Sequence, residues 1–441
     1  MLQHRRTLIV VLAALALVSV YRFRSISRSY ESPSWIHRGR KSDDILNGTL
    51  GFEKIFVINL PARRGRRDAM TVASAVSNIN LTFIEGLTGD GLSSSTSKGG
   101  ITGQERAATK PLHSASAGAR GSWRSHMNVL QAIVGQGLGS ALVLEDDVDW
   151  DVRLKAQMRT FAAASRTWLD AQGEKRDGVS RAPKGQGKQH HDPKTFMPAY
   201  DTIPLSPDFL SRGPGLKRSA QSPYGDDWDV LWLGHCGADL PSAQPDEPSA
   251  GPPFPPSLIV SILDDATVPA PKHLKPHPFA LRDRLADAYP AHTRVVHAVN
   301  GNVCSLAYAV SQRGARKLLW RFNQEGFVDQ WDLMLRDYCM GGYEDGDGGD
   351  GDEDENERRG EPPTGPVCLT VQPPLISHHY AGEAGGASVS NIRGQGGGLA
   401  RVKKGTSYVR LSVQENLKGL LAGLSVDELV DQLPDDGDTL W

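Results

Sequence analysis

The sequence predicts an α/β protein with a mixed, mainly parallel sheet covered by helices. Residues 141–144 are four consecutive apolar residues between polar neighbours, which is typical of a strand buried on both faces. A second strand pattern at 55–60 is followed by a helical stretch at 68–76, and a helical pattern at 121–134 precedes residue 141. Strands that alternate with helices favour a parallel sheet.

Acidic residues follow the strand at 141–144 directly. They are Glu145, Asp146, Asp147 and, two residues further on, Asp149. Neighbouring carboxylates repel one another, so a folded chain keeps them together when they are solvated, protonated or bound to a cation. In open α/β sheets, ligands bind beyond the carboxyl ends of the strands. The pattern indicates a divalent-metal site for a phosphate-bearing substrate, and the alternative is a solvated acidic loop.

The composition describes a globular protein without a strong overall charge. The chain has 441 residues, of which 39% are hydrophobic, enough for one large or two ordinary domains. Its 49 Lys and Arg residues nearly balance its 51 Asp and Glu residues. Because no overall field directs the protein to nucleic acid, we expect no nucleic-acid partner.

Residues 1–24 are expected to form a cytosolic tail and a signal anchor. Basic residues at 4–6, 22 and 24 flank the apolar run at 7–20, which has the length of a short span or of a signal-peptide core. No clear small-x-small cleavage site closes the run, so an uncleaved anchor is favoured over a cleaved signal peptide. We therefore expect a single-pass type II protein of the Golgi or endoplasmic reticulum membrane, with the domain that follows the anchor in the lumen.

The rest of the chain is expected to form one domain with insertions. A stem at 25–50 precedes a domain at 51–400, and a tail at 401–441 carries one short amphipathic helix at 426–433. Three stretches without periodicity are interpreted as insertions, mostly without regular structure. They lie near 171–225, 238–290 and 343–366, the last being an acidic run without the EF-hand arrangement.

Several further elements have recognisable ends. Ser125 is a predicted N-cap of the helix at 121–134. Ser311 is the predicted N-cap of the helical stretch that follows it, up to residue 319. Two strands at 293–296 and 304–310 are expected to form a hairpin around residues 300–302. The four cysteines lack metal-finger spacing, and Cys339 with Cys368 is the expected disulfide if the cysteines are not reduced.

Candidate functional side chains lie at two helix starts. Asn59 and the Arg cluster that contains Arg63 and Arg64 follow the strand at 55–60, where they would meet a diphosphate; the alternative is an exposed basic helix start. Asp329 is a candidate acid-base residue, with a helix cap as its other interpretation. His126 beside Ser125 is either structural or a ligand contact.

These pieces follow one another in an order that resembles glycosyltransferase family 25. That family includes bacterial lipopolysaccharide galactosyltransferases and animal procollagen galactosyltransferases, and the resemblance covers roughly residues 52–393. The matching pieces are residues 55–60 with the Arg cluster after them, 121–126, 142–147, 307–308 with 314–315 and 318–319, 328–329, and 390–392.

The resemblance implies a GT-A type fold, a nucleotide-sugar donor such as UDP-galactose, Mn²⁺ or Mg²⁺ as cofactor, and transfer with inversion at the anomeric carbon. It also implies site residues. Glu145, Asp146 and Asp147 would hold the metal and the diphosphate; Asn59, Arg63 and Arg64 would lie near the nucleotide; Ser125, His126, Ser390 and Asn391 would contact the donor; and Asp329, then Asp229, would be the candidate base.

Two positions depart from the family pattern. The family commonly has Gly-Cys before the Ser-His pair, whereas this chain has Gly121 followed by Ser122 and Trp123. Where the family usually carries Gln, the chain has His378 and His379, which are either a source of a third metal ligand or a surface pair.

The sequence as a whole predicts a membrane-anchored enzyme that moves a hexose, galactose first, to a hydroxyl of a glycan or glycoprotein. Two other functions remain open at this point. One is a metal-dependent hydrolase that uses the same acids. The other is a catalytically degenerate protein that binds a glycan or nucleotide sugar.

Overall fold

The computed structural model describes residues 45–89, 116–176, 200–205, 222–241, 257–275, 283–341, 365–381 and 404–440. All of them belong to one compact unit, residues 39–441. The predicted signal anchor, most of the stem, most of the acidic insertion, Ser390 and Asn391 lie outside the described residues. Within the described ranges, no helix has both the length and the apolar character needed to cross a bilayer.

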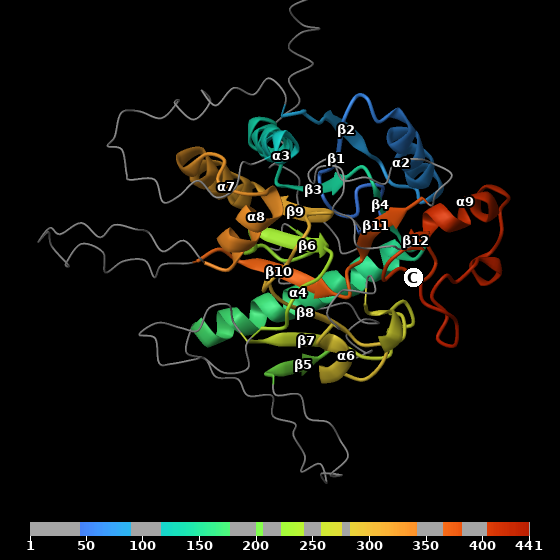
Figure 1. Ribbon diagram of the computed structural model, residues 1–441. Coiled ribbons are helices and arrows are strands. Elements are labelled where there is room, and N and C mark those ends of the chain that lie inside the picture. Colours follow the sequence, from blue (N-terminus) through green and yellow to red (C-terminus); the bar gives the residue numbers. More distant parts are fainter. Residues whose placement is uncertain are drawn as a thin grey trace, which may run out of the picture. The chain divides into compact units, whose positions relative to one another are not determined.

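The centre of the fold is a nine-stranded mixed sheet in the order β2-β1-β3-β9-β6-β10-β8-β7-β5 (Figure 1). Its strands are β1 Lys54–Asn59, β2 Thr82–Glu85, β3 Ser140–Glu145, β5 Thr202–Pro204, β6 Val230–Gly234, β7 Ile259–Ile262, β8 Arg294–Ala298, β9 Ala307–Ser311 and β10 Cys368–Gln372. The expected mixed α/β sheet is therefore present.

Strand direction decides which residues meet at one edge of this sheet. β1, β2, β6, β10, β7 and β5 run in the same direction as β3, while β8 and β9 run in the opposite direction. The expected hairpin of β8 with β9 is wrong, because β9 lies between β3 and β6 and β8 lies between β10 and β7. All residues of both strands are buried, and an interior position in the sheet satisfies that pattern.

Helices cover both faces of the sheet. α2 Arg64–Val76 and α4 Leu154–Arg176 contribute to one apolar core, and α3 Ala117–Gly135, α7 Gln312–Glu325 and α8 Trp331–Cys339 contribute to a second. A short helix, α6 Leu285–Ala288, belongs to a third, smaller core. Figure 1 shows α3, α7 and α8 grouped together, at the left.

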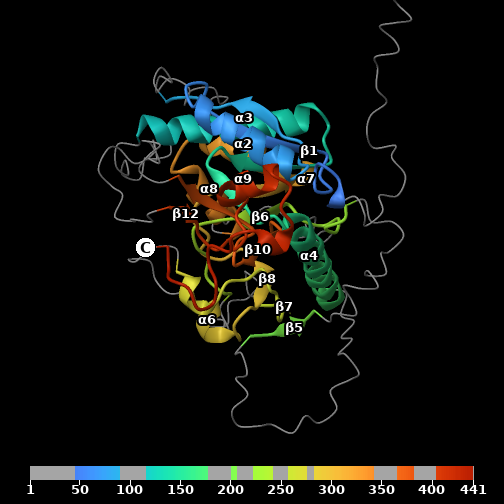
Figure 2. The same ribbon diagram turned by 90° about the vertical axis from the view of Figure 1, so that its right-hand side faces the viewer.

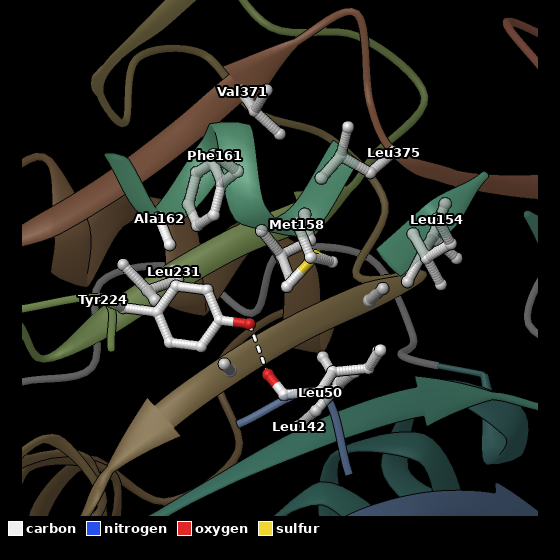
Figure 3. Close-up of a cluster of buried hydrophobic side chains, with 14 of the residues drawn as sticks. Leu50, Leu142, Leu154, Met158, Phe161, Ala162, Tyr224, Leu231, Val371 and Leu375 are labelled. Atoms are coloured by element: carbon white, nitrogen blue, oxygen red, sulfur yellow. Dashed lines mark hydrogen bonds between the residues drawn. The ribbon is translucent and has the colours of Figure 1, made fainter. Parts of the chain in front are cut away.

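The first core is built around α4. Met158 and Phe161 of α4 lie in it with Leu231 of β6, and all three side chains are fully buried (Figure 3). Tyr224 completes this core, and its hydroxyl donates a hydrogen bond to the carbonyl of Leu50. Burying each large apolar side chain stabilises the fold by roughly 1.5–3 kcal/mol, so the buried side chains of α4 hold this helix against the sheet.

Two predicted insertions contain strands of the main sheet. α4 continues to Arg176 inside the stretch 171–225, and β5 within the same stretch pairs with β7. β7 itself lies inside the stretch 238–290 and is buried at all four residues. The interpretation of both stretches as insertions without regular structure is thus wrong at these points. Pro-rich flanks mask the short strands in the sequence, and Pro204 is tolerated because β5 is an edge strand.

The segment 404–440 is part of the fold and not a separate tail. β4 Val148–Trp150, β11 Ile376–Tyr380 and β12 Gly405–Thr406 form a second sheet, in the order β12-β11-β4. The segment continues with α9 Val413–Leu421, and the predicted helix at 426–433 is only the short 3₁₀ turn η6, Val426–Glu428. This segment, red in both views, faces the viewer in Figure 2.

Helix caps and disulfides complete the frame. Ser311 caps α7 as predicted, since its hydroxyl accepts from the Gly314 amide. The prediction of Ser125 as a cap is wrong, because α3 begins eight residues earlier and is capped by Ser116. The expected Cys339–Cys368 disulfide is present, together with a second one. The second pair is Cys236–Cys304.

Candidate active site

The acids lie in a tight turn between two strands. β3 ends at Glu145, Asp146 and Asp147 form the turn, and β4 begins at Val148. Because β1 runs parallel to β3, the end of β1 at Asn59 lies at the same edge of the sheet. The structure therefore places the acids beyond the carboxyl ends of parallel strands, where α/β proteins bind ligands.

Asp146 is held from the first strand and the first helix. It is buried and accepts hydrogen bonds from Nδ2 of Asn59 at 2.8 Å and from Nη1 of Arg66 at 2.8 Å. Nη1 of Arg63 lies 3.9 Å from its Oδ1 atom. The structure thus brings Asn59 and Arg63 to the acids, while the neighbouring Arg64 is exposed.

Asp147 lies between a cation and an imidazole. Its Oδ2 atom is 2.6 Å from Nη1 of Arg66 and 3.4 Å from Nε2 of His378, whereas its Oδ1 atom is buried and has no hydrogen-bond partner among the residues that the structure describes. Burial alone would raise the pKa of Asp147, but the charges of His378, Arg66 and Arg63 outweigh it and hold the pKa below its usual range. Asp147 is therefore an ionised carboxylate with one free oxygen.

Glu145 has a different environment. Its Oε1 atom accepts a hydrogen bond from the Ser305 hydroxyl at 3.1 Å. Burial, followed by the negative charge of Asp147, raises the pKa of Glu145 to about 8. Asp332 adds to this repulsion. Two neighbouring carboxyl groups therefore differ strongly in proton affinity, a feature that is common at functional sites.

The residues of the turn fit a hard divalent cation that the protein ligates only in part. Carboxylate oxygens are the ligands that Mg²⁺ and Mn²⁺ prefer, and Oδ1 of Asp147 offers buried lone pairs. His378 supplies an imidazole beside it. Over the ranges that the structure describes, no three His, Cys, Asp or Glu side chains are arranged to hold a metal by themselves.

The fourth acid of the run does not belong to this group. Asp149 is fully buried and accepts hydrogen bonds from the hydroxyls of Thr406 and Ser412 and from the amide of Gln414. All three donors come from the segment 404–440. Asp149 therefore joins this segment to β4 instead of facing a ligand.

Ser125 and His126 are buried within α3, and they hydrogen-bond to residues outside the acidic turn. The Ser125 hydroxyl donates to the Gly121 carbonyl and accepts from the Leu87 amide. Nδ1 of His126 lies 2.8 Å from the Tyr308 hydroxyl, and the ring stacks on Trp331 with the centroids 4.7 Å apart. Burial lowers the pKa of His126 to about 3, so the ring stays neutral. The structure supports the structural interpretation of His126.

Asp229 lies at the opposite edge of the sheet from the acids. It precedes β6, which runs parallel to β3, and so it sits at the amino end of that strand. Its carboxylate is fully buried, 2.9 Å from Nε of Arg313 and 2.9 Å from Nζ of Lys317, and it accepts from the Val367 amide. The structure therefore does not bring this second candidate base to the acids.

Replacement of this buried carboxylate should affect stability alone. We expect Asp229→Asn to lower the free energy of unfolding by about 2 kcal/mol, because Arg313 and Lys317 lose their shared counter-charge but remain partly solvated. Urea unfolding measures this loss. A free energy of unfolding equal to that of the unmodified protein would contradict this placement of Asp229.

Near α8, the structure connects a different carboxylate from Asp329 with the acidic turn. Asp329 accepts a hydrogen bond from the adjacent Gln330 amide. Oδ2 of Asp332 accepts from the Cys304 amide at 2.8 Å, and its charge acts on Glu145. Asp332 is therefore the carboxylate that the structure connects with the acidic turn.

Sequence reasoning missed three residues of this site. Arg66 belonged to the recognised Arg cluster; it lies in the first turn of α2, three residues after Arg63, which precedes the helix, and this short spacing is the signal that could have identified it. Ser305 and Asp332 carry no local signal. They reach Glu145 through the position of β9 inside the sheet and the packing of α8.

Fold and site together define an α/β protein with a buried acidic turn at the carboxyl edge of a mixed sheet. Residues 52–182, which contain β1, α2, β3 and the acidic turn, match the model of a family described as glycosyltransferase family 25 (LPS biosynthesis protein). This match confirms the resemblance over that part of the chain.

Curated relatives agree with the family match. The chain is 30% identical over 148 residues to procollagen galactosyltransferase 1 of Danio rerio, a match that covers 32% of this chain and 24% of the relative. It is 30% identical over 114 residues to procollagen galactosyltransferase 2 of Mus musculus, which covers 25% of this chain and 18% of the relative. The human procollagen galactosyltransferase 2 gives the same identity and coverage. The matches thus span a quarter of these relatives or less.

Proposed function

We propose that the protein is a metal-dependent glycosyltransferase that moves a hexose from a nucleotide sugar to a hydroxyl of a glycan or glycoprotein. UDP-galactose is the proposed donor, because the matched relatives are named galactosyltransferases. The observation that carries the proposal is the buried Oδ1 atom of Asp147, which no described residue hydrogen-bonds, on a carboxylate whose Oδ2 atom lies beside Arg66 and His378.

Mn²⁺ or Mg²⁺ would bind at Asp147 and His378, next to Glu145. When bound, such an ion neutralises the charge that builds on a leaving diphosphate. Arg63 and Arg66 bring two guanidinium groups to the same place, and guanidinium groups bind phosphate oxygens in pairs. The cation and the two arginines together suit a nucleoside diphosphate.

The proposed transfer proceeds with inversion at the anomeric carbon, which requires a group that takes the proton of the acceptor hydroxyl. We propose Asp332 for this role, since its carboxylate is connected with Glu145 and Cys304 at the carboxyl edge of the sheet. Asp329, three residues earlier, is the alternative. If either acid has this role, its replacement should lower the rate of transfer without lowering the affinity for UDP.

We further propose that the domain works in the lumen of the Golgi or endoplasmic reticulum, attached through residues 1–24 as a type II membrane protein. The two disulfides support this placement, because disulfides persist in oxidising compartments and are rare in the cytosol. The names of the matched relatives, which refer to procollagen, point to a secretory-pathway acceptor.

A screen of nucleotide sugars tests the proposal. The fragment from residue 39 onward should be used, because Ile45 and Leu50 are buried in the first core and a shorter fragment would remove part of it. We expect Mn²⁺-dependent release of UDP from one donor, abolished by EDTA. Release that needs no acceptor would identify a hydrolase, and binding of Mn²⁺ and UDP without turnover would identify a degenerate binding protein.

A further inference from the structure

A buried carboxylate joins the acidic turn to the distant end of the chain. Oδ2 of Asp149 accepts hydrogen bonds from Oγ1 of Thr406 at 2.7 Å and from the Ser412 hydroxyl, and Oδ1 accepts from the Gln414 amide at 3.2 Å. Asp149 and Thr406 are both fully buried. A buried carboxylate is tolerated only when hydrogen bonds replace its lost hydration, so these donors are required where they stand.

The same contacts hold the two strands that carry the proposed cation ligands. β4 pairs with β11 so that Val148 lies opposite His378 and Asp149 lies opposite Ser377. The His379 amide also donates to the Asp147 carbonyl at 2.9 Å. Asp147 and His378 are therefore brought together by the pairing of β4 with β11.

Thr406 connects both strands through one hydroxyl group. Its Oγ1 atom donates to Asp149 of β4 and lies 3.0 Å from Nδ1 of His379 on β11. β12, which carries Thr406, also pairs directly with β11. One side chain thus bridges the strand that follows Asp147 and the strand that contains His378.

The segment that supplies these donors is closed by its own hydrogen bonds. The Gln432 side chain accepts from the Thr406 amide at 3.1 Å and donates to the Thr406 carbonyl at 3.0 Å. The Asn416 side chain makes the same pair of contacts with the amide and carbonyl of Val430. Nδ2 of Asn416 also donates to the Ser412 carbonyl at 2.9 Å, so Thr406 and Ser412 are both held by contacts that do not involve Asp149.

We infer that Thr406 and Ser412 are positioning residues of the acidic site, which hold Asp149 and thereby set the distance between Asp147 and His378. The inference rests on the proposed function only for the identity of the bound cation. The segment 404–440 then supports the strands that carry Asp147 and His378, and none of its side chains needs to contact the ligand.

An isosteric pair of variants tests this inference on the fragment from residue 39 onward. Thr406→Val keeps the shape of the side chain but removes the hydroxyl, and Thr406→Ser keeps the hydroxyl. We expect the Kd for Mn²⁺, measured by calorimetry, to rise about tenfold in Thr406→Val and to stay near the original value in Thr406→Ser. Ser412→Ala, which removes the second hydroxyl, should also raise it.

Ser425→Ala is the matched control in the same segment. Its hydroxyl is exposed and, among the described residues, bonds within the capping box with Glu428, so Mn²⁺ affinity should not change. A loss of affinity in this control equal to that in Thr406→Val would show a general effect of the segment and overturn the inference. Unchanged affinity in both Thr406→Val and Ser412→Ala would overturn it as well.

Hydrogen exchange separates this inference from the proposed function. If the unmodified protein binds no Mn²⁺, the proposed function fails, and amide exchange over 146–150 and 376–380 then decides the positioning role. Faster exchange there in Thr406→Val, with exchange elsewhere unchanged and Thr406→Ser normal, supports the inference. Equal exchange in all variants refutes it.

Discussion

Asp147→Asn is expected to weaken Mn²⁺-dependent UDP binding well beyond tenfold. The substitution keeps the size of the side chain but removes the negative charge from the carboxylate whose Oδ1 atom is free. A hard cation binds an amide oxygen more weakly than a carboxylate, and of the two carboxylates that pair with Arg66 only Asp146 then remains to offset its repulsion of the cation. Calorimetry with UDP, with and without Mn²⁺, measures the effect.

Asp68→Asn on α2 is the control for this change. Asp68 is exposed and lies close in sequence to Arg66, so its replacement alters the net charge equally without entering the turn. UDP affinity should then remain as before. An unaltered affinity in Asp147→Asn itself would remove the acidic turn from the mechanism, and thermal melting of both variants separates loss of binding from loss of folding.

Removal of the Cys236–Cys304 disulfide should reduce both stability and ligand binding. The bridge closes a loop of 68 residues, and loop-closure entropy predicts a loss of about 4 kcal/mol in the free energy of unfolding for Cys236→Ala/Cys304→Ala. Cys304 also adopts a φ of 64°, unusual for a residue with a side chain. Its amide holds Asp332, and the next residue, Ser305, holds Glu145. Relaxation at Cys304 therefore moves two acids of the site.

The second disulfide provides the comparison. Cys339–Cys368 closes a loop of 29 residues, so Cys339→Ala/Cys368→Ala should lose about 3.5 kcal/mol. This bridge joins the end of α8 to the start of β10, at the edge of the sheet away from the acids. At a temperature where both variants are folded, only the Cys236–Cys304 variant should bind UDP more weakly in the presence of Mn²⁺. Equal weakening in both would show that the bridge has no particular connection with the site.

Much of the fold could be predicted where the signal is local. β1, β3 and β6 appear as apolar runs with polar ends, and α7 begins at the residue that its cap predicts. The acidic turn was found because four apolar residues change abruptly to carboxylates. Such patterns survive in the structure because strand burial and helix capping depend on neighbours a few residues away.

The sequence-based predictions are wrong for strands whose pairing depends on residues far away in the chain. β7 is only four residues long between Pro-rich stretches, and it becomes a strand because β8 and β5 pair with it on either side. The order of β8 and β9 was wrong for the same reason. Which strands pair depends on how the faces of the whole sheet are buried. The sequence of one short strand does not contain this information.

The sequence by itself determined the class of the fold, the position of the acidic turn at the carboxyl end of a buried strand, and the arginines that follow the first strand. Only the tertiary structure decided which contacts each acid makes. Asp147 lies beside His378, while Asp149 accepts hydrogen bonds from the hydroxyls of Thr406 and Ser412 near the end of the chain. The physical reason is that carboxylates in one run look alike in sequence, and their roles follow from the donors that pairing of remote strands brings to each of them.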